Sequence, residues 1–171
     1  MRIISLVRSL SLMPQAAVKP DLCNCLAIRK AARHITQHYD RALAPAGLRT
    51  TQYSILVRLM RSGPRTINEL ADDLAMDRTT MGRNIRPLER DGLVAIATDA
   101  YDRRRRALSV TETGRARCAA AAERWREAQA RFDEIYGADQ ALALRTTLAG
   151  VLACDFQMKP DRQMASQGEA V

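Results

Sequence analysis

The order of the segments between residues 66 and 110 constrains the fold of this chain most strongly. Apolar residues recur at three- and four-residue steps in two adjacent stretches, which predicts two short helices joined by a tight turn. Two β-prone runs follow, and the polar stretch between them predicts a hairpin with a long loop. The four segments are residues 66–75, 78–90, 93–97 and 107–110. Helix, turn, helix and hairpin in this order predict a winged helix-turn-helix.

Longer amphipathic segments flank this module. The first follows Asp21, a suitable N-cap, and ends before Pro45. The second begins near Thr50 and stops at a Ser-Gly-Pro sequence, and two more occupy residues 111–137 and 138–154. We therefore predict a mainly α protein with a small β-hairpin, in which a winged helix-turn-helix is flanked by N- and C-terminal dimerisation helices.

The apolar faces of the flanking helices exceed what a small winged core can cover. They need a partner, and a two-fold partner matches a palindromic DNA site. A monomer whose flanking helices fold onto its own core is the alternative. The expected parts are an N-terminal extension, a helical dimerisation region in two pieces, the winged helix-turn-helix and a flexible tail, at residues 1–20, 21–46 with 112–156, 47–111 and 157–171.

Composition excludes several other classes of protein. The 171 residues suffice for one domain with tails, and 47% of them are apolar and 27% charged, as in packed globular proteins. Four scattered cysteines are too few for a secreted disulfide framework. No apolar run is long enough to span a membrane, and Arg8 interrupts the apolar start of the chain, so we expect a cytoplasmic protein rather than a secreted or membrane one.

The net charge of +8 suggests a polyanionic partner, and its distribution is uneven. Residues 1–60 hold 9 basic and 2 acidic groups, whereas residues 61–111 hold 10 and 8. Within that second segment, residues 78–106 alone hold 8 basic and 4 acidic groups, including four consecutive arginines. The placement of these arginines is therefore more informative than the total charge.

The arginine-rich residues fall on the two parts of a winged helix that approach DNA. In helix-turn-helix modules the second helix enters the major groove, where Arg suits guanine, Asn adenine, and Thr a phosphate or the thymine methyl. The loop of the hairpin can place guanidiniums on phosphates or in a narrow minor groove. The predicted contacts with double-stranded DNA are Arg78, Thr79, Thr80, Arg83, Asn84 and Arg86 on the helix, and Arg103, Arg104, Arg105 and Arg106 on the loop.

Each of these features also has a simpler explanation. An arginine run in a loop is usually a solvated charge cluster, and threonines at a helix start are usually caps. The order of the segments favours DNA contact, because arginines seldom occur by chance in both of the exposed parts of a winged helix.

The sequences INELADDLAMDRTTMGRNIRPLERDGLV, DRRRRALSVTETG and GLRTTQYSILVRLM resemble the MarR family of winged-helix transcriptional regulators over about residues 22–155. The family's wing signature falls on Asp102, Arg104, Thr111 and Gly114. The resemblance implies that Arg104 contacts DNA at the wing tip and that Asp102 braces the wing. It also implies an obligate homodimer on a pseudo-palindromic operator, usually a repressor relieved by a small molecule or an oxidant.

Two residues depart from the family pattern. Gly82 stands where the family often has Thr or Ser, so a hydroxyl contact is lost and the helix is locally weakened. Pro87 lies inside the predicted recognition helix and cannot donate to the Arg83 carbonyl. We expect a kink or an early helix end there, with base contacts confined to the preceding turns.

The cysteines raise the alternative of a redox-sensing regulator. By resemblance, Cys25 falls at the position of the reactive cysteine of peroxide-sensing family members, and Tyr39 at that of one tyrosine contacting the thiolate. Arg29 replaces the second tyrosine and could stabilise a thiolate itself. Cys25 and Tyr39 are about 21 Å apart along one helix, so they can meet only through an antiparallel partner helix. The other interpretation of Cys25 is a small buried core residue. For Cys23, Cys118 and Cys154, the sequence does not distinguish a redox-active thiol from an inert one.

The two histidines, His34 and His38, have the i,i+4 spacing of a zinc pair, but no third ligand is evident. We therefore predict no metal and no cofactor. These histidines, together with Tyr39 and Tyr53, are candidates to contact a small aromatic or anionic effector, and plain surface or core roles are the alternative.

The sequence contains no phosphate-binding Gly loop, metalloprotease helix or nucleophile elbow, so we expect no enzyme. A winged-helix module that binds protein instead of DNA is the remaining alternative, and the placement of the arginines argues against it.

Overall fold

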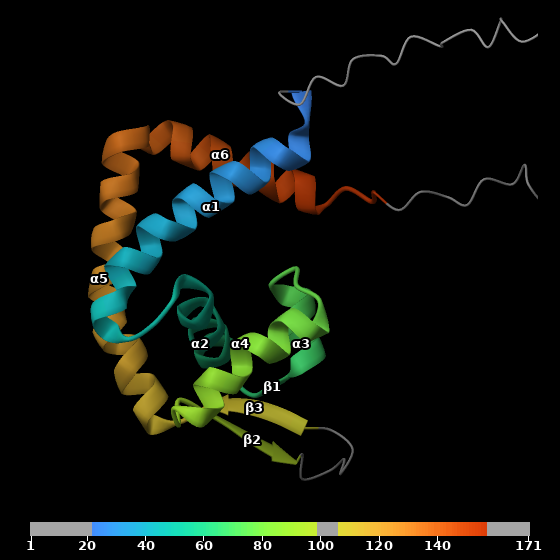
Figure 1. Ribbon diagram of the computed structural model, residues 1–171, viewed down its shortest axis with the longest axis vertical. Helices are drawn as coiled ribbons and strands as arrows, with labels where there is room; N and C mark the ends of the chain where they lie inside the picture. The colour runs from blue at the N-terminus through green and yellow to red at the C-terminus, as the bar shows by residue number, and fades with distance from the viewer. Residues whose placement is uncertain (1–21, 99–105, 157–171) are drawn as a thin grey trace, which may run out of the picture. The chain divides into compact units, whose positions relative to one another are not determined.

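The computed structural model describes residues 22–98 and 106–156 and has the predicted class, mainly helical with a small antiparallel sheet (Figure 1). Its elements are α1 (Asn24–Leu43), a 3-10 turn η2 (Ala44–Ala46), α2 (Thr50–Ser62), β1 (Arg65–Thr66), α3 (Ile67–Asp73), α4 (Arg78–Arg90), β2 (Val94–Thr98), β3 (Arg106–Val110), α5 (Glu112–Tyr136) and α6 (Ala138–Leu152). The chain divides into two compact units after Ala128, inside α5. The expected extension 1–20 and tail 157–171 lie outside the described residues.

The sheet has three strands, in the order β1-β3-β2, rather than the two of a simple hairpin. Strands β2 and β3 pair antiparallel from Val94 opposite Val110 to Thr98 opposite Arg106. The unpredicted strand β1 pairs Arg65 with Leu108. A two-residue strand has no periodicity of its own, and only pairing with β3, some forty residues later, defines it.

The core of the first unit lies where α2, α3 and α4 meet the sheet and the first half of α5. Its fully buried large side chains are aliphatic, and burying each contributes about 1.5–3 kcal/mol relative to exposure. They are Leu43, Ile55, Leu56, Leu70, Met81, Leu88 and Leu93. Because Met81, Ile85 and Leu88 of α4 are all buried, packing fixes which face of α4 remains outside.

Side chains at the helix starts set where each helix begins. The carboxylate of Asp77 accepts the backbone N–H of Thr80 at 2.8 Å, which confirms Asp77 as the cap of α4. Thr66 caps α3, and Glu69 accepts its backbone N–H at 2.7 Å. The expected Asp21 cap is wrong: α1 begins at Asn24, with Cys23 as N-cap, because the sulfur of Cys23 accepts the Leu26 N–H at 3.4 Å.

Of the kink or early helix end expected at Pro87, the early end is wrong, because α4 continues to Arg90. Proline removes a single donor, and the next turn re-forms with the Asp91 N–H donating to the Pro87 carbonyl at 2.9 Å. Ile85 and Leu88, on either side of the proline, are buried and hold the helix against the core.

The Thr-x-x-Gly sequence after the wing joins the sheet to α5. The Thr111 hydroxyl donates to the Gly92 carbonyl at 2.7 Å and accepts the Gly114 N–H at 3.0 Å. A Cβ on Gly114 would overlap the Leu93 carbonyl oxygen and lie 2.8 Å from Cγ1 of Val110. Glycine is therefore required here by the close approach of two backbone segments.

Candidate nucleic-acid interface

Helix α4 turns a polar, basic face to the outside of the first unit. Arg78, Thr79, Arg83 and Arg86 are exposed. The opposite face is held in the core, and α3 and α2 pack beside α4 (Figure 1). The predicted groove-reading arginines thus stand on a firmly packed helix.

Thr80 and Asn84 are half-buried and make contacts within the helix. The Thr80 hydroxyl donates to Oδ2 of Asp77 at 2.6 Å, and the Asn84 side-chain amide donates to the Thr80 carbonyl at 2.9 Å. The hydrogen bonds from the Thr80 hydroxyl and backbone N–H hold the pKa of Asp77 below its usual value. Thr80 therefore reinforces the cap, and Asn84 must leave the Thr80 carbonyl before its amide can pair with a base.

The strands β2 and β3 carry the wing. Of the four predicted wing arginines the structure describes Arg106, which is exposed at the start of β3 opposite Thr98. Asp102, Arg103, Arg104 and Arg105 lie outside the described residues, so their contacts are a matter for proposal.

A polar hollow between the start of α2 and the second half of α4, called here the α2–α4 hollow, adjoins the exposed face of α4. Its volume is about 380 Å³. It is lined by Arg49, Gln52, Arg83, Asn84, Pro87, Arg90 and Asp91. Sequence reasoning missed Arg49, Gln52 and Arg90 as candidates, because only the packing of α2 against α4 brings them beside Arg83.

Asp40 joins α1 to α2. Its Oδ1 accepts the Thr50 backbone N–H at 2.7 Å and the Thr50 hydroxyl at 2.6 Å. A carboxylate near the start of a helix satisfies an unpaired N–H and interacts favourably with the helix dipole. The carboxylate nearest the histidines in sequence thus serves as a helix cap.

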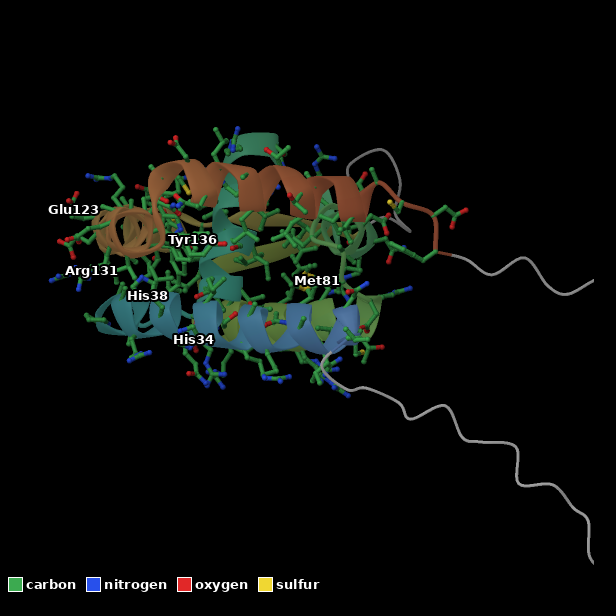
Figure 2. The ribbon with its side chains drawn as sticks, turned by 90° about the horizontal axis from the view of Figure 1, so that it is seen from above. His34, His38, Met81, Glu123, Arg131 and Tyr136 are labelled. Carbon is green, nitrogen blue, oxygen red and sulfur yellow. The ribbon has the colours of Figure 1, made fainter. Side chains whose placement is uncertain are left out.

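The four effector candidates differ in exposure and in the groups that they contact. His34 and His38 both lie on α1 (Figure 2); His34 is exposed, whereas Nε2 of half-buried His38 lies 2.9 Å from the Ala128 carbonyl oxygen. His38 also meets buried Tyr39 edge to face, with ring centroids 5.2 Å apart. Tyr53 is buried and stacks on Trp125 at 6.3 Å, and burial raises its pKa.

The cysteines differ in access to solvent. Cys23 and Cys25 are exposed at the start of α1, and so is Arg29. Cys118 is buried in the core, and burial raises the pKa of its thiol. Cys154, in the second unit, is exposed and its thiol donates to the Gly150 carbonyl at 3.3 Å.

The described residues include neither a grouped set of metal ligands nor a membrane-spanning helix. Over residues 22–98 and 106–156, no three His, Cys, Asp or Glu side chains are grouped as a metal site would need. Among the helices of the same ranges, none is both long and apolar enough to cross a membrane.

Comparison with known proteins points to one family. A MarR family model matches residues 46–105. The transcriptional activatory protein BadR of Rhodopseudomonas palustris is 33% identical over 105 residues, which is 58% of this chain and 60% of BadR.

Two solved structures are similar over most of their length. The Mycobacterium tuberculosis regulator MosR in complex with DNA is 35% identical, with a TM-score of 0.64 over 77% of this chain and 99% of MosR. The repressor CouR bound to a 23-mer DNA duplex is 27% identical, with a TM-score of 0.70 over 76% of this chain and 92% of CouR. A second structure of CouR, from Rhodococcus jostii, holds p-coumaroyl-CoA.

Proposed function

This chain belongs to the MarR family of winged-helix transcriptional regulators, and from that premise we propose that it is a homodimeric repressor of a pseudo-palindromic operator. That it is a DNA-binding transcriptional regulator follows from the family. Repression is proposed by analogy with CouR, which matches over most of its length, whereas BadR, named an activator, matches over 60%.

The exposed basic face of α4 carries the proposal for the DNA surface. In the proposed complex with DNA, Arg78, Arg83 and Arg86 enter the major groove from a helix whose other face is packed in the core. Thr79, Thr80 and Asn84 lie among them. The wing, Arg103 to Arg106, contacts the adjacent backbone or minor groove, and Asp102 braces it.

Exposed apolar side chains support the proposed dimer. From Leu22, just before α1, to Arg33 within it, all residues are exposed, and Leu22 is 74% exposed. In the second unit, α6 and the segment after it expose further large apolar side chains: Leu142, Leu148, Val151, Leu152 and Phe156. Apolar surface on this scale usually marks an interface. Light scattering at several protein concentrations tests it, and a monomer throughout would refute the dimer.

The proposed effector is a small aromatic or anionic molecule. His38 and Tyr39 pack together on α1, and CouR, similar over most of its length, binds an aromatic acyl-CoA. We expect such a ligand to release the protein from DNA. The measurement is a gel shift on the DNA upstream of the protein's own coding sequence, with aromatic acids and their CoA thioesters added singly. Capture of a protein partner without any duplex binding at low salt would instead favour a protein-interaction module.

A redox-sensing regulator is the second candidate, because Cys25 is exposed at the start of α1, close to exposed Cys23. Here an organic hydroperoxide would oxidise the Cys25 thiol to a sulfenic acid, and the hydroperoxide would be reduced to its alcohol. This candidate is supported if the oxidant abolishes DNA binding, if reductant restores it, and if the Cys25→Ser variant keeps its DNA binding in the presence of the oxidant. Binding that ignores the oxidant refutes it and leaves the small-molecule effector.

A further inference from the structure

Beyond the recognition helix and the wing, the α2–α4 hollow has the composition of an anion site. Three of its side chains are arginines, and one is an acid, Asp91. Arg90 and Asp91 form an ion pair at 2.9 Å, and both are largely exposed. Arg49 and Arg83 form no ion pair with any residue that the structure describes. The hollow therefore presents two guanidiniums whose charge is not neutralised by a neighbouring carboxylate.

The spacing along α4 connects this hollow with the proposed DNA surface. Residues 83, 87 and 90 recur at steps of four and three, so they form one stripe on the helix. Arg83 belongs both to the exposed groove-reading face and to the lining of the hollow. Pro87 lies in the middle of this stripe and also lines the hollow.

The start of α2 supplies the other wall without acting as an anion site itself. The first N–H of the helix, that of Thr50, donates to Asp40 at 2.7 Å, and the backbone N–H of the preceding Arg49 donates to the Gln52 side chain at 2.9 Å. The attraction for an anion thus comes from the guanidiniums, which bind phosphate oxygens in a planar, two-pronged geometry.

We propose that the α2–α4 hollow holds one backbone phosphate of the bound duplex, gripped by Arg49 and Arg83 and assisted by Arg90. This inference rests on the proposed DNA surface, with which the hollow shares Arg83. A phosphate held beside the recognition helix fixes the register of α4 in the groove and carries no sequence information of its own. A free phosphate ion has the same chemistry, so the test must separate the two sources.

The first measurement is duplex affinity by fluorescence anisotropy at several salt concentrations, on operator and scrambled DNA, with the full chain. Each phosphate contact adds about 0.9 to the slope of log affinity against log salt. Arg49→Gln should therefore flatten the slope by about one unit and weaken binding to both duplexes about eight-fold at 0.1 M salt. The ratio of operator affinity to scrambled-duplex affinity should stay unchanged. Arg61→Gln is the matched control, because it removes the same charge from the exposed far end of α2, about 18 Å away along the helix.

A second variant should change DNA affinity in the opposite direction. Asp91→Asn removes the carboxylate from the hollow and releases Arg90, so it should tighten binding to both duplexes. The slope and affinity of Arg49→Gln matching those of Arg61→Gln would overturn the proposal, as would weaker binding by Asp91→Asn. If the wild-type chain binds neither duplex, the proposed function itself fails, and the two failures are thereby distinguished.

The source of the phosphate is settled by calorimetric titration of inorganic phosphate into the DNA-free protein. No saturable binding is expected, since the duplex delivers its phosphate only after α4 has docked. Saturable binding that Arg49→Gln abolishes, together with unchanged DNA affinity of that variant, would assign the hollow to a free anion and refute the DNA contact.

Discussion

Replacing Gly114 with alanine tests the explanation of the Thr-x-x-Gly sequence after the wing. The added Cβ would overlap the Leu93 carbonyl oxygen, and it would lie 3.0 Å from the Leu93 carbonyl carbon and 2.8 Å from Cγ1 of Val110. Two of these three atoms are backbone and cannot rotate away, so β2 or α5 must shift. Overpacking of this kind costs about 1–3 kcal/mol, and a backbone obstacle places Gly114→Ala at the upper end.

The gain in helix propensity offsets part of this cost. Alanine is favoured over glycine by up to about 1 kcal/mol in a helix interior, which leaves a net loss of about 2 kcal/mol. For a chain of this size that lowers Tm by roughly 4–8 °C. The assay is thermal and urea unfolding followed by Trp125 fluorescence, at one fixed protein concentration because dimerisation would stabilise the folded state.

Gly82→Ala is the matched control in the same unit. A Cβ there would lie 3.7 Å from Cδ1 of Ile67, an ordinary contact, within α4. It should stabilise the protein by about 0.5–1 kcal/mol. A Gly114→Ala protein as stable as wild type, or as Gly82→Ala, would refute the account of how the sheet joins α5.

Three other predictions concern single side chains. Asp40→Ala should cost about 1 kcal/mol in urea unfolding, since Thr50 loses its cap, and an unchanged midpoint would contradict that role. Cys118 should react with a thiol reagent far more slowly than the exposed cysteines in the native protein and equally fast in urea, and fast native labelling would contradict its burial. Burial raises the pKa of Tyr53 above 10.0, so the neutral phenol stabilises the fold below pH 10, and this contribution is lost as pH rises through the folded pKa. The free energy of unfolding of Tyr53→Phe should therefore fall less above pH 10 than that of the wild type. An equal fall in both proteins would contradict the shift.

The parts of the fold that depend on local sequence could be predicted. The periodicity of 78–90, the Asp77 cap and the β-prone runs gave α4, its boundaries and the paired strands, because caps and apolar spacing act within one or two turns. The early helix end expected at Pro87 is wrong, because tertiary packing of Ile85 and Leu88 outweighs one missing hydrogen bond.

The parts of the fold and of the site that depend on contacts between distant residues could not be predicted from the sequence. Strand β1 exists only through pairing with β3, and Arg49 enters the α2–α4 hollow only through packing of α2 on α4. Sequence could name Thr80 and Asn84 as base-contacting candidates, but it could not reveal that both already bond within the helix. The predicted roles of the DNA-contacting residues stay predictions until binding is measured.

The most direct test of the central claim is the salt dependence of operator binding, measured by anisotropy for the wild-type chain, Arg86→Ala on α4 and Arg104→Ala on the wing. The account predicts a steep wild-type slope and, for Arg104→Ala, weaker binding to every duplex with a slope flatter by about one unit. Arg86→Ala should lower operator affinity more than scrambled-duplex affinity if it reads a base. Wild-type affinity and slope retained in both variants would contradict the assignment of α4 and the wing as the DNA-binding surface.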